Sequence, residues 1–155
     1  MASFIGNYTC KTDEKGRVTL PTAFKKALPA EAHDTFIVKK DIYQKCLVLY
    51  PQNEWEKQVE QIRASLNPYN KEHMIFLRGF YKDTAEVELD ATNRLLIPRR
   101  LLDEAGIGKE AVLAGIDNKI EIWSKESYDT IDAGEDFAIL AGKILGGTNQ
   151  KTEKP

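Results

Sequence analysis

Eight short segments of the chain, four on each side of a central region with helical spacing, are rich in apolar residues, and apolar and polar positions alternate clearly in "AEVELD" and weakly in "GNYTCKT". Such segments, rich in Val, Ile, Leu and Tyr, predict β-strands with one buried face. The first four segments are "GNYTCKT", "RVTL", "TFIVKK" and "CLVLY", and the other four are "AEVELD", "RLLIP", "EAVLAGI" and "KIEIW". Turn-forming stretches such as "DEKG" and "DN" separate neighbouring segments and predict hairpins.

Spacings of three and four between apolar residues predict helices between and after these strands. Pro21 and Pro98 each follow a strand and open a short helix, because proline is favoured in the first helical turn. The central region predicts two longer helices separated by "NPYN". We expect another short helix from near Ser124 past Tyr128, and one around "DFAILAGKIL".

The second of the two central helices has apolar residues on two faces. One face carries Met74, Leu77 and Tyr81, and the other carries His73, Phe76 and Phe80. Such a helix needs two surfaces to cover it. It either buries both faces inside the chain or offers one to a neighbouring subunit.

The two halves of the chain repeat one another. One constant shift along the chain superposes three pairs of identical residues: Asp13 on Asp90, Arg17 on Arg94, and Pro21 on Pro98. Further along, "CLVLYPQNEWE" falls on "KIEIWSKESYD" only after a shift that is shorter by four. The first copy therefore has four additional residues, which we place in the loop near "KKDIYQKC" because loops tolerate insertions best.

Composition indicates a globular protein of 155 residues, with 42% hydrophobic and 30% charged residues. No apolar run approaches the roughly 20 residues that cross a membrane, and "MASFIGNYTC" lacks the features of a secretory signal. We therefore expect a cytoplasmic protein without a membrane partner. Two cysteines and two histidines are too few and too scattered for a zinc site, so we predict no metal and no cofactor.

The repeated acid-x-x-x-Arg motif carries the most informative chemistry. At a hairpin turn an aspartate accepts hydrogen bonds from backbone N–H groups further along, and Gly16 allows the positive φ that closes the turn. The arginine then begins the next strand in a fixed orientation, which suits phosphate oxygens or the O6/N7 edge of guanine. Alternatively, the Asp–Arg pair only stabilises the hairpin or a subunit contact.

Local charge favours the first of these interpretations. The net charge of −2 argues against a nucleic-acid partner for the chain as a whole. Residues 11–26, however, carry a local charge of +3, and residues 90–102 carry +2. Acidic residues gather elsewhere, including Glu54, Glu56 and Glu60 on the first central helix. A basic face on an acidic chain is typical of a protein that binds nucleic acid with one side.

Three motifs in order resemble the MraZ family: "GNYTCKTDEKGRVTLPTAFKKAL", "EVELDATNRLLIP" and "GIDNKIEIWSKESYD". Members of this family are bacterial regulators with two AbrB/SpoVT-like half-domains, each marked by D-x-x-x-R. The resemblance implies an α+β, mainly β fold: a pseudo-symmetric, swapped-hairpin β-barrel with linker and C-terminal helices. It also implies a ring-shaped homo-oligomer, associated with the nucleoid, that binds tandem DNA repeats in the promoter of the cell-division and cell-wall gene cluster.

Carried over by position, the motif residues that shape the turns are Asp13, Gly16, Asp90 and Asn93. The residues expected to contact DNA are Arg17, Lys15, Lys11, Lys25, Lys26, Arg94, Arg99 and Arg100. Asn93 replaces the glycine usual before the second arginine, and asparagine tolerates the left-handed conformation better than most residues. Leu102 and Asp103 occupy the positions equivalent to Lys25 and Lys26. We therefore expect the first half to contact DNA more directly.

The expected organisation has five segments. They are a first half-domain over 4–52, a helical linker over 53–82, a second half-domain over 83–128, a C-terminal helix over 129–142 and a disordered tail over 143–155. An oligomeric scaffold that does not bind DNA is the alternative function. We do not expect an enzyme, because the sequence lacks a nucleophile with a base, a free pair of carboxylates and a phosphate-binding glycine loop.

Overall fold

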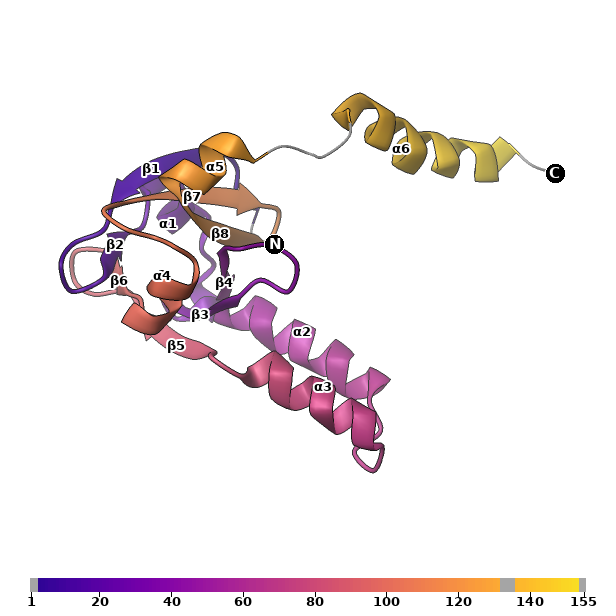
Figure 1. The fold of residues 1–155 in the computed structure, drawn as a ribbon, viewed down its shortest axis with the longest axis horizontal. Coiled ribbons are helices and arrows are strands. Elements are labelled where there is room, and N and C mark those ends of the chain that lie inside the picture. The colour runs from indigo at the N-terminus through magenta and orange to yellow at the C-terminus, as the bar shows by residue number, and fades with distance from the viewer. Residues whose placement is uncertain (1–2, 132–135, 154–155) are drawn as a thin grey trace.

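The computed structural model describes residues 3–131 and 136–153, which form an α+β protein (Figure 1). Its strands are β1 (Asn7–Lys11), β2 (Arg17–Thr19), β3 (Thr35–Lys40), β4 (Leu47–Pro51), β5 (Ala85–Glu88), β6 (Arg94–Leu96), β7 (Glu110–Ile116) and β8 (Lys119–Ser124). Its helices are α1 (Thr22–Ala27), the 3-10 helix η1 (Ala30–Ala32), α2 (Gln52–Ser65), α3 (Lys71–Tyr81), α4 (Arg99–Glu104), α5 (Lys125–Thr130) and α6 (Phe137–Glu153). The structure thus confirms the eight segments predicted as strands.

The two halves of the chain are intertwined in one sheet. Its strand order is β1-β7-β8-β4-β3-β5, and all neighbouring pairs are antiparallel. If each strand is exchanged for its counterpart in the other half, β1 for β5, β3 for β7 and β4 for β8, the result is the same strand order read from the opposite edge. The sheet is therefore symmetric about its centre. The first strand of each half pairs with the third strand of the other. Neither half therefore completes the sheet alone.

The strand register locates the pseudo-twofold axis. In the central β4–β8 pair, Val48 lies opposite Glu121, its equivalent in the second copy. In the separate two-stranded sheet of β2 and β6, Val18 likewise lies opposite its equivalent, Leu95. A residue faces its own equivalent only where a twofold axis passes between them, so the axis passes through both pairs.

The four additional residues of the first half lie in two places. Val87 pairs with Phe36, and the equivalent of Val87 in the first half, Cys10, pairs with Ala111. Phe36 and Ala111 are therefore equivalent. Their separation in sequence is two residues shorter than that between Val18 and Leu95, and two residues longer than that between Val48 and Glu121. Two additional residues thus precede β3, in the connection that contains η1, and two lie in the loop between β3 and β4. Placing all four in that loop was wrong, because a helix-to-strand connection also accommodates insertions.

The large sheet is open, so the expected closed barrel is not found. Its edge strands, β1 and β5, continue through turns into β2 and β6, which pair with each other. The isolated bridge between Thr12 and Val18 connects the β1 side with this small sheet, and the backbone N–H of Asp13 also donates to the carbonyl of Arg17. Closure would require a ladder between β1 and β5, and the chain instead uses the β2–β6 ribbon to span that end of the fold.

Equivalent residues of both repeats fill one hydrophobic core. Six of them are at most 2% exposed: Val18, Leu20 and Phe24 from the first half, and Leu95, Ile97 and Leu101 from the second. Fully burying an aliphatic or aromatic side chain contributes about 1.5–3 kcal/mol. The core thereby anchors β2 and β6, together with the short helices that follow them.

Helices α2 and α3 form a hairpin that projects from the sheet (Figure 1). The indole of Trp55 stacks on the ring of Phe80 with centroids 5.4 Å apart, and Phe80 is buried. Ile75 and Phe76, in contrast, are 58% and 46% exposed. The buried Phe80 and the exposed Phe76 belong to the same predicted face, and Tyr81 of the other face is 43% exposed. Neither predicted face is therefore buried throughout, and the helix leaves apolar residues of both in solvent.

The C-terminal part of the chain differs from the expected segments. Ser124 caps α5 by accepting a hydrogen bond from the backbone N–H of Ser127, as expected for a helix that begins there. The helix expected over 129–142 is instead α6, Phe137–Glu153, and residues 132–135 lie outside the described part. The helical backbone continues through most of the tail that we expected to be disordered, since no proline interrupts it before Pro155. Within the described ranges, no helix is long and apolar enough to cross a membrane.

Gly115 in β7 provides a test of this packing. A Cβ at this position would overlap the carbonyl group of Phe4 and lie 2.9 Å from the backbone nitrogen of Ile5. We expect Gly115→Ala to lower the free energy of unfolding by about 1–3 kcal/mol, because the fully buried Phe4 must move. Gly108→Ala, where the added Cβ has no neighbour within 4 Å, should change it by less than about 0.5 kcal/mol. Equal stabilities of the two variants in chemical denaturation would contradict the close contact.

Candidate nucleic-acid interface

The first turn is organised by the carboxylate of Asp13. Its Oδ1 accepts hydrogen bonds from the backbone nitrogens of Lys15 and Arg17, both at 2.9 Å. Its Oδ2 accepts from Nε of Arg17 at 2.6 Å, which forms an ion pair within the turn. The Gly16 backbone N–H closes the turn by donating to the Asp13 carbonyl at 3.0 Å. The arginine is thus held along one edge of its guanidinium group.

The second turn repeats this arrangement around Asp90. Its Oδ1 accepts hydrogen bonds from the backbone nitrogen and the hydroxyl of Thr92 and from the backbone nitrogen of Arg94. Its Oδ2 pairs with Nε of Arg94 at 3.0 Å. The two D-x-x-x-R motifs therefore have the same local geometry, as their identical spacing predicts.

A residue in the left-handed conformation closes each turn, Gly16 in the first and Asn93 in the second. The two positions differ in whether they can accommodate a side chain. Gly16 has a φ of 90°, and a Cβ there would lie 2.9 Å from the carbonyl oxygen of Ile97. Asn93 has a φ of 61°, which is the left-handed helical region that asparagine enters more readily than most residues. The departure from glycine thus leaves the second turn intact.

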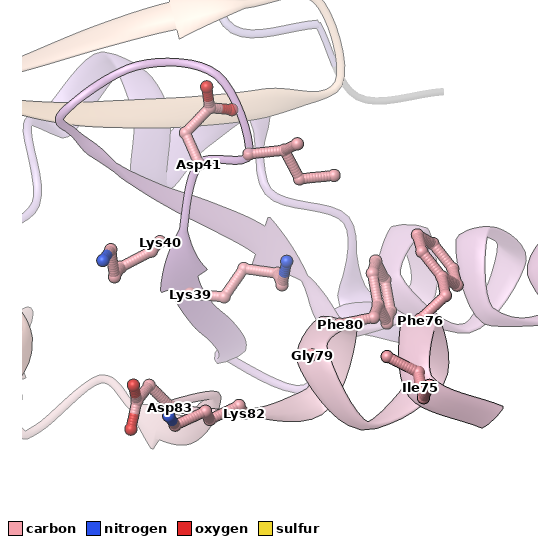
Figure 2. A pocket seen from close by; sticks show the side chains of 10 residues that line it. Lys39, Lys40, Asp41, Ile75, Phe76, Gly79, Phe80, Lys82 and Asp83 are labelled. Carbon is pink, nitrogen blue, oxygen red and sulfur yellow. The ribbon is translucent and has the colours of Figure 1, made fainter. Parts of the chain in front are cut away.

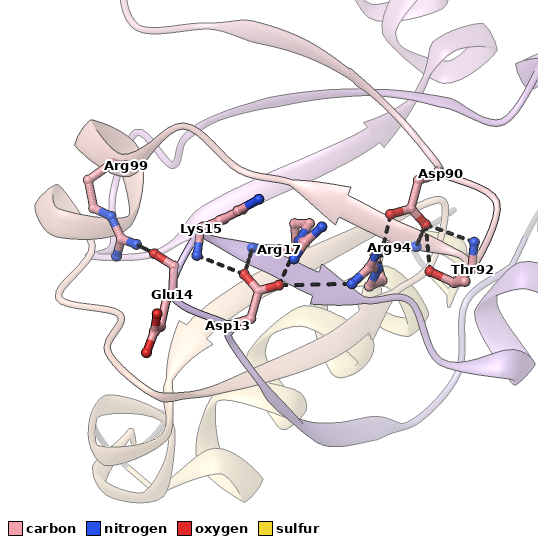
Figure 3. Close-up of polar contacts among 8 residues, drawn as sticks. All are labelled: Asp13, Glu14, Lys15, Arg17, Asp90, Thr92, Arg94 and Arg99. Atoms are coloured by element: carbon pink, nitrogen blue, oxygen red, sulfur yellow. Dashed lines mark hydrogen bonds and ion pairs between the residues drawn. The ribbon is translucent and has the colours of Figure 1, made fainter.

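Pairing between the repeats brings the two turns together (Figure 3). The backbone N–H of Ile97 donates to the carbonyl of Gly16, and that of Leu20 donates to the carbonyl of Asn93. As a result, Nη1 of Arg94 lies 4.0 Å from Oδ2 of Asp13. The two arginines therefore belong to one continuous site, although they come from opposite halves of the sequence.

The β2–β6 ribbon has one buried and one outward face. Val18 and Leu95 point inward and are fully buried. The alternating positions form the outward face, in which Arg17 pairs across the strands with Leu96 and Thr19 with Arg94. Leu96 is 55% exposed, and Thr19 is also exposed. The sequence prediction missed these two uncharged residues, although their positions two residues from each arginine identify the same face.

Hydrogen bonding stabilises the ionised carboxylates of both turns. The backbone N–H of Arg17 is the main cause that lowers the pKa of Asp13 from its ordinary value. The backbone N–H of Arg94, with the N–H and hydroxyl of Thr92, lowers the pKa of Asp90 to about 2. Both carboxylates are therefore ionised at neutral pH, which keeps the arginines oriented.

The other predicted basic residues differ in their availability. Lys11, Lys15 and Lys26 are exposed, and no ion pair involves them within the described residues. Lys25 pairs with Asp34 at 2.6 Å, and Arg100 pairs with Asp83 at 2.8 Å. The remaining one, Arg99, donates from Nη2 to the backbone carbonyl of Glu14 at 2.7 Å and thereby connects the second half to the first turn.

The two halves are unequal around the turns for a structural reason. Leu102, the equivalent of Lys25, is fully buried in the core, where it lies beneath the Gly16 turn. The second half therefore uses for packing a position at which the first half carries a cation. No group of three or more potential metal ligands occurs among residues 3–131 and 136–153.

Fold and site together define a class of protein: two strand-exchanged repeats in one chain that present two Asp-oriented arginines on a β-ribbon. A sequence model described as "MraZ protein, putative antitoxin-like" matches residues 3–78 and 80–138. The chain is 44% identical over 147 residues to the "Transcriptional regulator MraZ" of Phocaeicola vulgatus, covering 94% of this chain and 96% of that protein. The proteins of the same name from Christiangramia forsetii and Bacteroides thetaiotaomicron are 41% and 37% identical, with 94–97% of each chain covered. The chain belongs to the MraZ family of transcriptional regulators.

Titration of Asp90 tests the turn geometry. Because its pKa is about 2 in the folded chain and ordinarily 3.8, the ionised form stabilises the fold above about pH 4. This contribution disappears as the pH falls from about 4 to about 2. We therefore expect wild type to be more stable than Asp90→Asn at pH 5–7, with the difference shrinking below about pH 4.

The measurement is chemical denaturation at a series of pH values. Asp103→Asn is the control, because Asp103 is exposed and its carboxylate has no hydrogen bond among the described residues. A difference between wild type and Asp90→Asn that is independent of pH would contradict the ionic role of Asp90.

Proposed function

We propose that the chain is a sequence-specific DNA-binding regulator that uses the β2–β6 ribbon to contact tandem promoter repeats as a ring-shaped homo-oligomer. The observation that carries this proposal is the convergence of Arg17 and Arg94 on one outward face. The named function of the relatives supports it, since each is called a transcriptional regulator.

The ribbon suits the major groove of DNA. A two-stranded antiparallel ribbon fits this groove, and arginine is the commonest reader of the guanine O6/N7 edge. Asp13 and Asp90 bind Nε of the two arginines, so the orientation of each guanidinium is fixed before DNA arrives. Among the described residues the terminal nitrogens donate no hydrogen bond, and Nη1 of Arg94 has only a longer ion contact, at 4.0 Å to Oδ2 of Asp13, so they can contact a base edge or a phosphate. Preorganisation of this kind lowers the entropy lost on binding.

The neighbouring lysines suit the phosphate backbone. Lys11 and Lys15 flank the first turn, and Lys26 is exposed on α1. All three belong to the first half, so this half makes more of the electrostatic contacts. Lys25 joins them if its ion pair with Asp34 exchanges for a phosphate, and Arg99 and Arg100 extend the surface on the second half.

A ring explains how a chain with a net charge of −2 binds a polyanion. Each subunit contributes a few contacts, and a ring engages several repeats at once, so that weak contacts gain avidity. Three acidic residues lie on α2 rather than on the ribbon: Glu56 and Glu60 are exposed, while Glu54 is buried and bonded to Lys57 and Asn118. At the ribbon, Asp13 and Asp90 are paired with the arginines, and Glu14 is exposed in the first turn. We place the protein in the cytoplasm at the nucleoid, acting on the promoter of the cell-division and cell-wall gene cluster.

DNA binding over a salt series tests the proposal. We expect Arg17→Ala and Arg94→Ala each to weaken binding to a fragment with tandem repeats by about 5- to 150-fold, which corresponds to the loss of one specific arginine contact. Binding by wild type should also weaken steeply as salt increases. Fluorescence anisotropy measures both effects.

Arg63→Ala is the matched control, because it removes the same charge from an exposed site on α2. Equal affinities of all three variants and wild type, or binding that does not depend on salt, would overturn the proposal. An assembled protein that binds the repeats no better than a scrambled fragment would instead be a scaffold.

Leu96 tests whether the ribbon reads bases. An exposed aliphatic side chain between the arginines suits the methyl group of thymine. We expect Leu96→Ala to lower the preference for repeat DNA over scrambled DNA by about 5-fold or more, with little change in the salt dependence. Leu96→Ala should not lower stability, because the side chain is exposed. An unchanged preference would exclude Leu96 from base recognition.

A further inference from the structure

A pocket of about 440 Å³ lies between α3 and the loop that joins β3 to β4 (Figure 2). It is lined on one side by Ile75, Phe76 and Phe80, and on the other by Lys39 and Ile42. Ile42 and Ile75 are 63% and 58% exposed in the single chain. The pocket thus combines an apolar wall with a cationic group, and its lining contains no residue of β2 or β6.

Lys39 is a buried cation without an acceptor. The residue is only 6% exposed, and its Nζ lies 4.3 Å from the centre of the Phe80 ring. No hydrogen-bond acceptor contacts this Nζ among the described residues. Burial lowers the pKa of Lys39, while the charge of nearby Asp41 opposes that change. Because a buried ammonium group is costly without a partner, the site is complementary to a carboxylate.

The other charged groups around the pocket already have partners or lie in solvent. Asp41 accepts hydrogen bonds from the backbone nitrogens of Tyr43 and Gln44. Lys40 pairs with Glu104, and Asp83 pairs with Arg100. Lys82 adds a further positive charge to the lining. An incoming carboxylate therefore meets a net positive environment.

A second hollow continues the apolar surface along α3. It measures about 530 Å³, lies between α2 and α3, and is lined by Ile62, Leu66, His73 and Phe76 among others. Phe76 borders both hollows. The two hollows together follow α3 from Glu72 to Phe80, which is about 12 Å or two helical turns, and we call them the groove along α3.

Helix α6 is complementary to this groove in its apolar face and in its charge. Phe137 and Leu140 are 69% and 42% exposed, and Ala141 and Ile144 continue their face at helical spacing. Immediately before them, Asp136 presents an exposed carboxylate, of which one oxygen accepts a hydrogen bond from the backbone of Ala138. In Figure 1, α6 lies apart from α3 of its own chain.

We propose that the groove along α3 receives the first turns of α6 from a second copy of the chain, with the carboxylate of Asp136 paired to the ammonium of Lys39. Phe137 and Leu140 then cover Phe76 and Phe80. Two different surfaces meet in this contact, so each copy offers one groove and one helix. A head-to-tail contact of this type forms a ring when the rotation between neighbouring copies closes, and the inference therefore rests on the ring in the proposed function.

The experiment uses full-length variants and sedimentation velocity. We expect Phe76→Glu, in the groove, and Leu140→Glu, on α6, each to raise the protein concentration needed for assembly by at least about tenfold, since each places a charge in an apolar contact. Ile139→Glu is the matched control, because Ile139 is 53% exposed on the opposite face of α6. Lys39→Met should weaken assembly as Asp136→Asn does, and the double variant should add little to either.

Mixing the two variants identifies where α6 docks. Leu140→Glu keeps an intact groove and Phe76→Glu keeps an intact helix, so a mixture should form heterodimers and no larger ring. If wild type assembles and the variants assemble equally well, the docking of α6 is overturned but the proposed ring is not. If wild type is monomeric, both proposals are overturned. A mixture without heterodimers would assign the contact to a single chain and overturn the proposal. If the variants leave assembly unchanged, and wild type binds benzoate while Lys39→Met does not, the pocket is a site for small carboxylates and the proposal is overturned.

Discussion

Strand pairing between the two repeats is the constraint on which the rest of the structure depends. β1 and β5 each form a ladder with the third strand of the opposite half, and β4 and β8 join the halves at the centre. An isolated half would expose rows of unpaired N–H and C=O groups as well as core residues such as Phe36 and Leu113. The duplication thus gives one fold, and both repeats are expected to unfold together.

The same constraint produces the candidate site. Each D-x-x-x-R turn orients its own arginine through local hydrogen bonds, but only the β2–β6 pairing places both arginines on one surface. Because this ribbon crosses the pseudo-twofold axis at Val18 and Leu95, the site is nearly symmetric in its backbone. Its surroundings are not symmetric, since Lys25 is half-exposed on α1 while its equivalent, Leu102, packs in the core. A symmetric frame therefore carries an asymmetric distribution of charge.

The sequence predicts the features that depend on local patterns. Short apolar or β-branched runs bounded by turns, with alternation in some of them, identify all eight strands, and the internal repeat identifies the equivalent turns, which the register of Val18 and Leu95 confirms. It does not predict the open sheet, because closure depends on whether distant edges such as β1 and β5 meet. The ion pairs of Lys25 with Asp34 and of Arg100 with Asp83 also arise from tertiary structure. The prediction missed Thr19 and Leu96 because it was based on charged residues, and these two uncharged residues lie on the same outward face of the ribbon.

Tethered cleavage of DNA tests most directly whether the ribbon is the DNA-binding surface. An iron chelate attached at Thr19→Cys places a source of hydroxyl radicals on the outward face of β2, and one at Tyr69→Cys places it at the tip of the α2–α3 hairpin, where Tyr69 is 95% exposed. The native thiols interfere little, because Cys46 is buried and burial raises the pKa of Cys10. We expect cuts within each promoter repeat from position 19 and none from position 69. Cuts from position 69 alone would contradict the account.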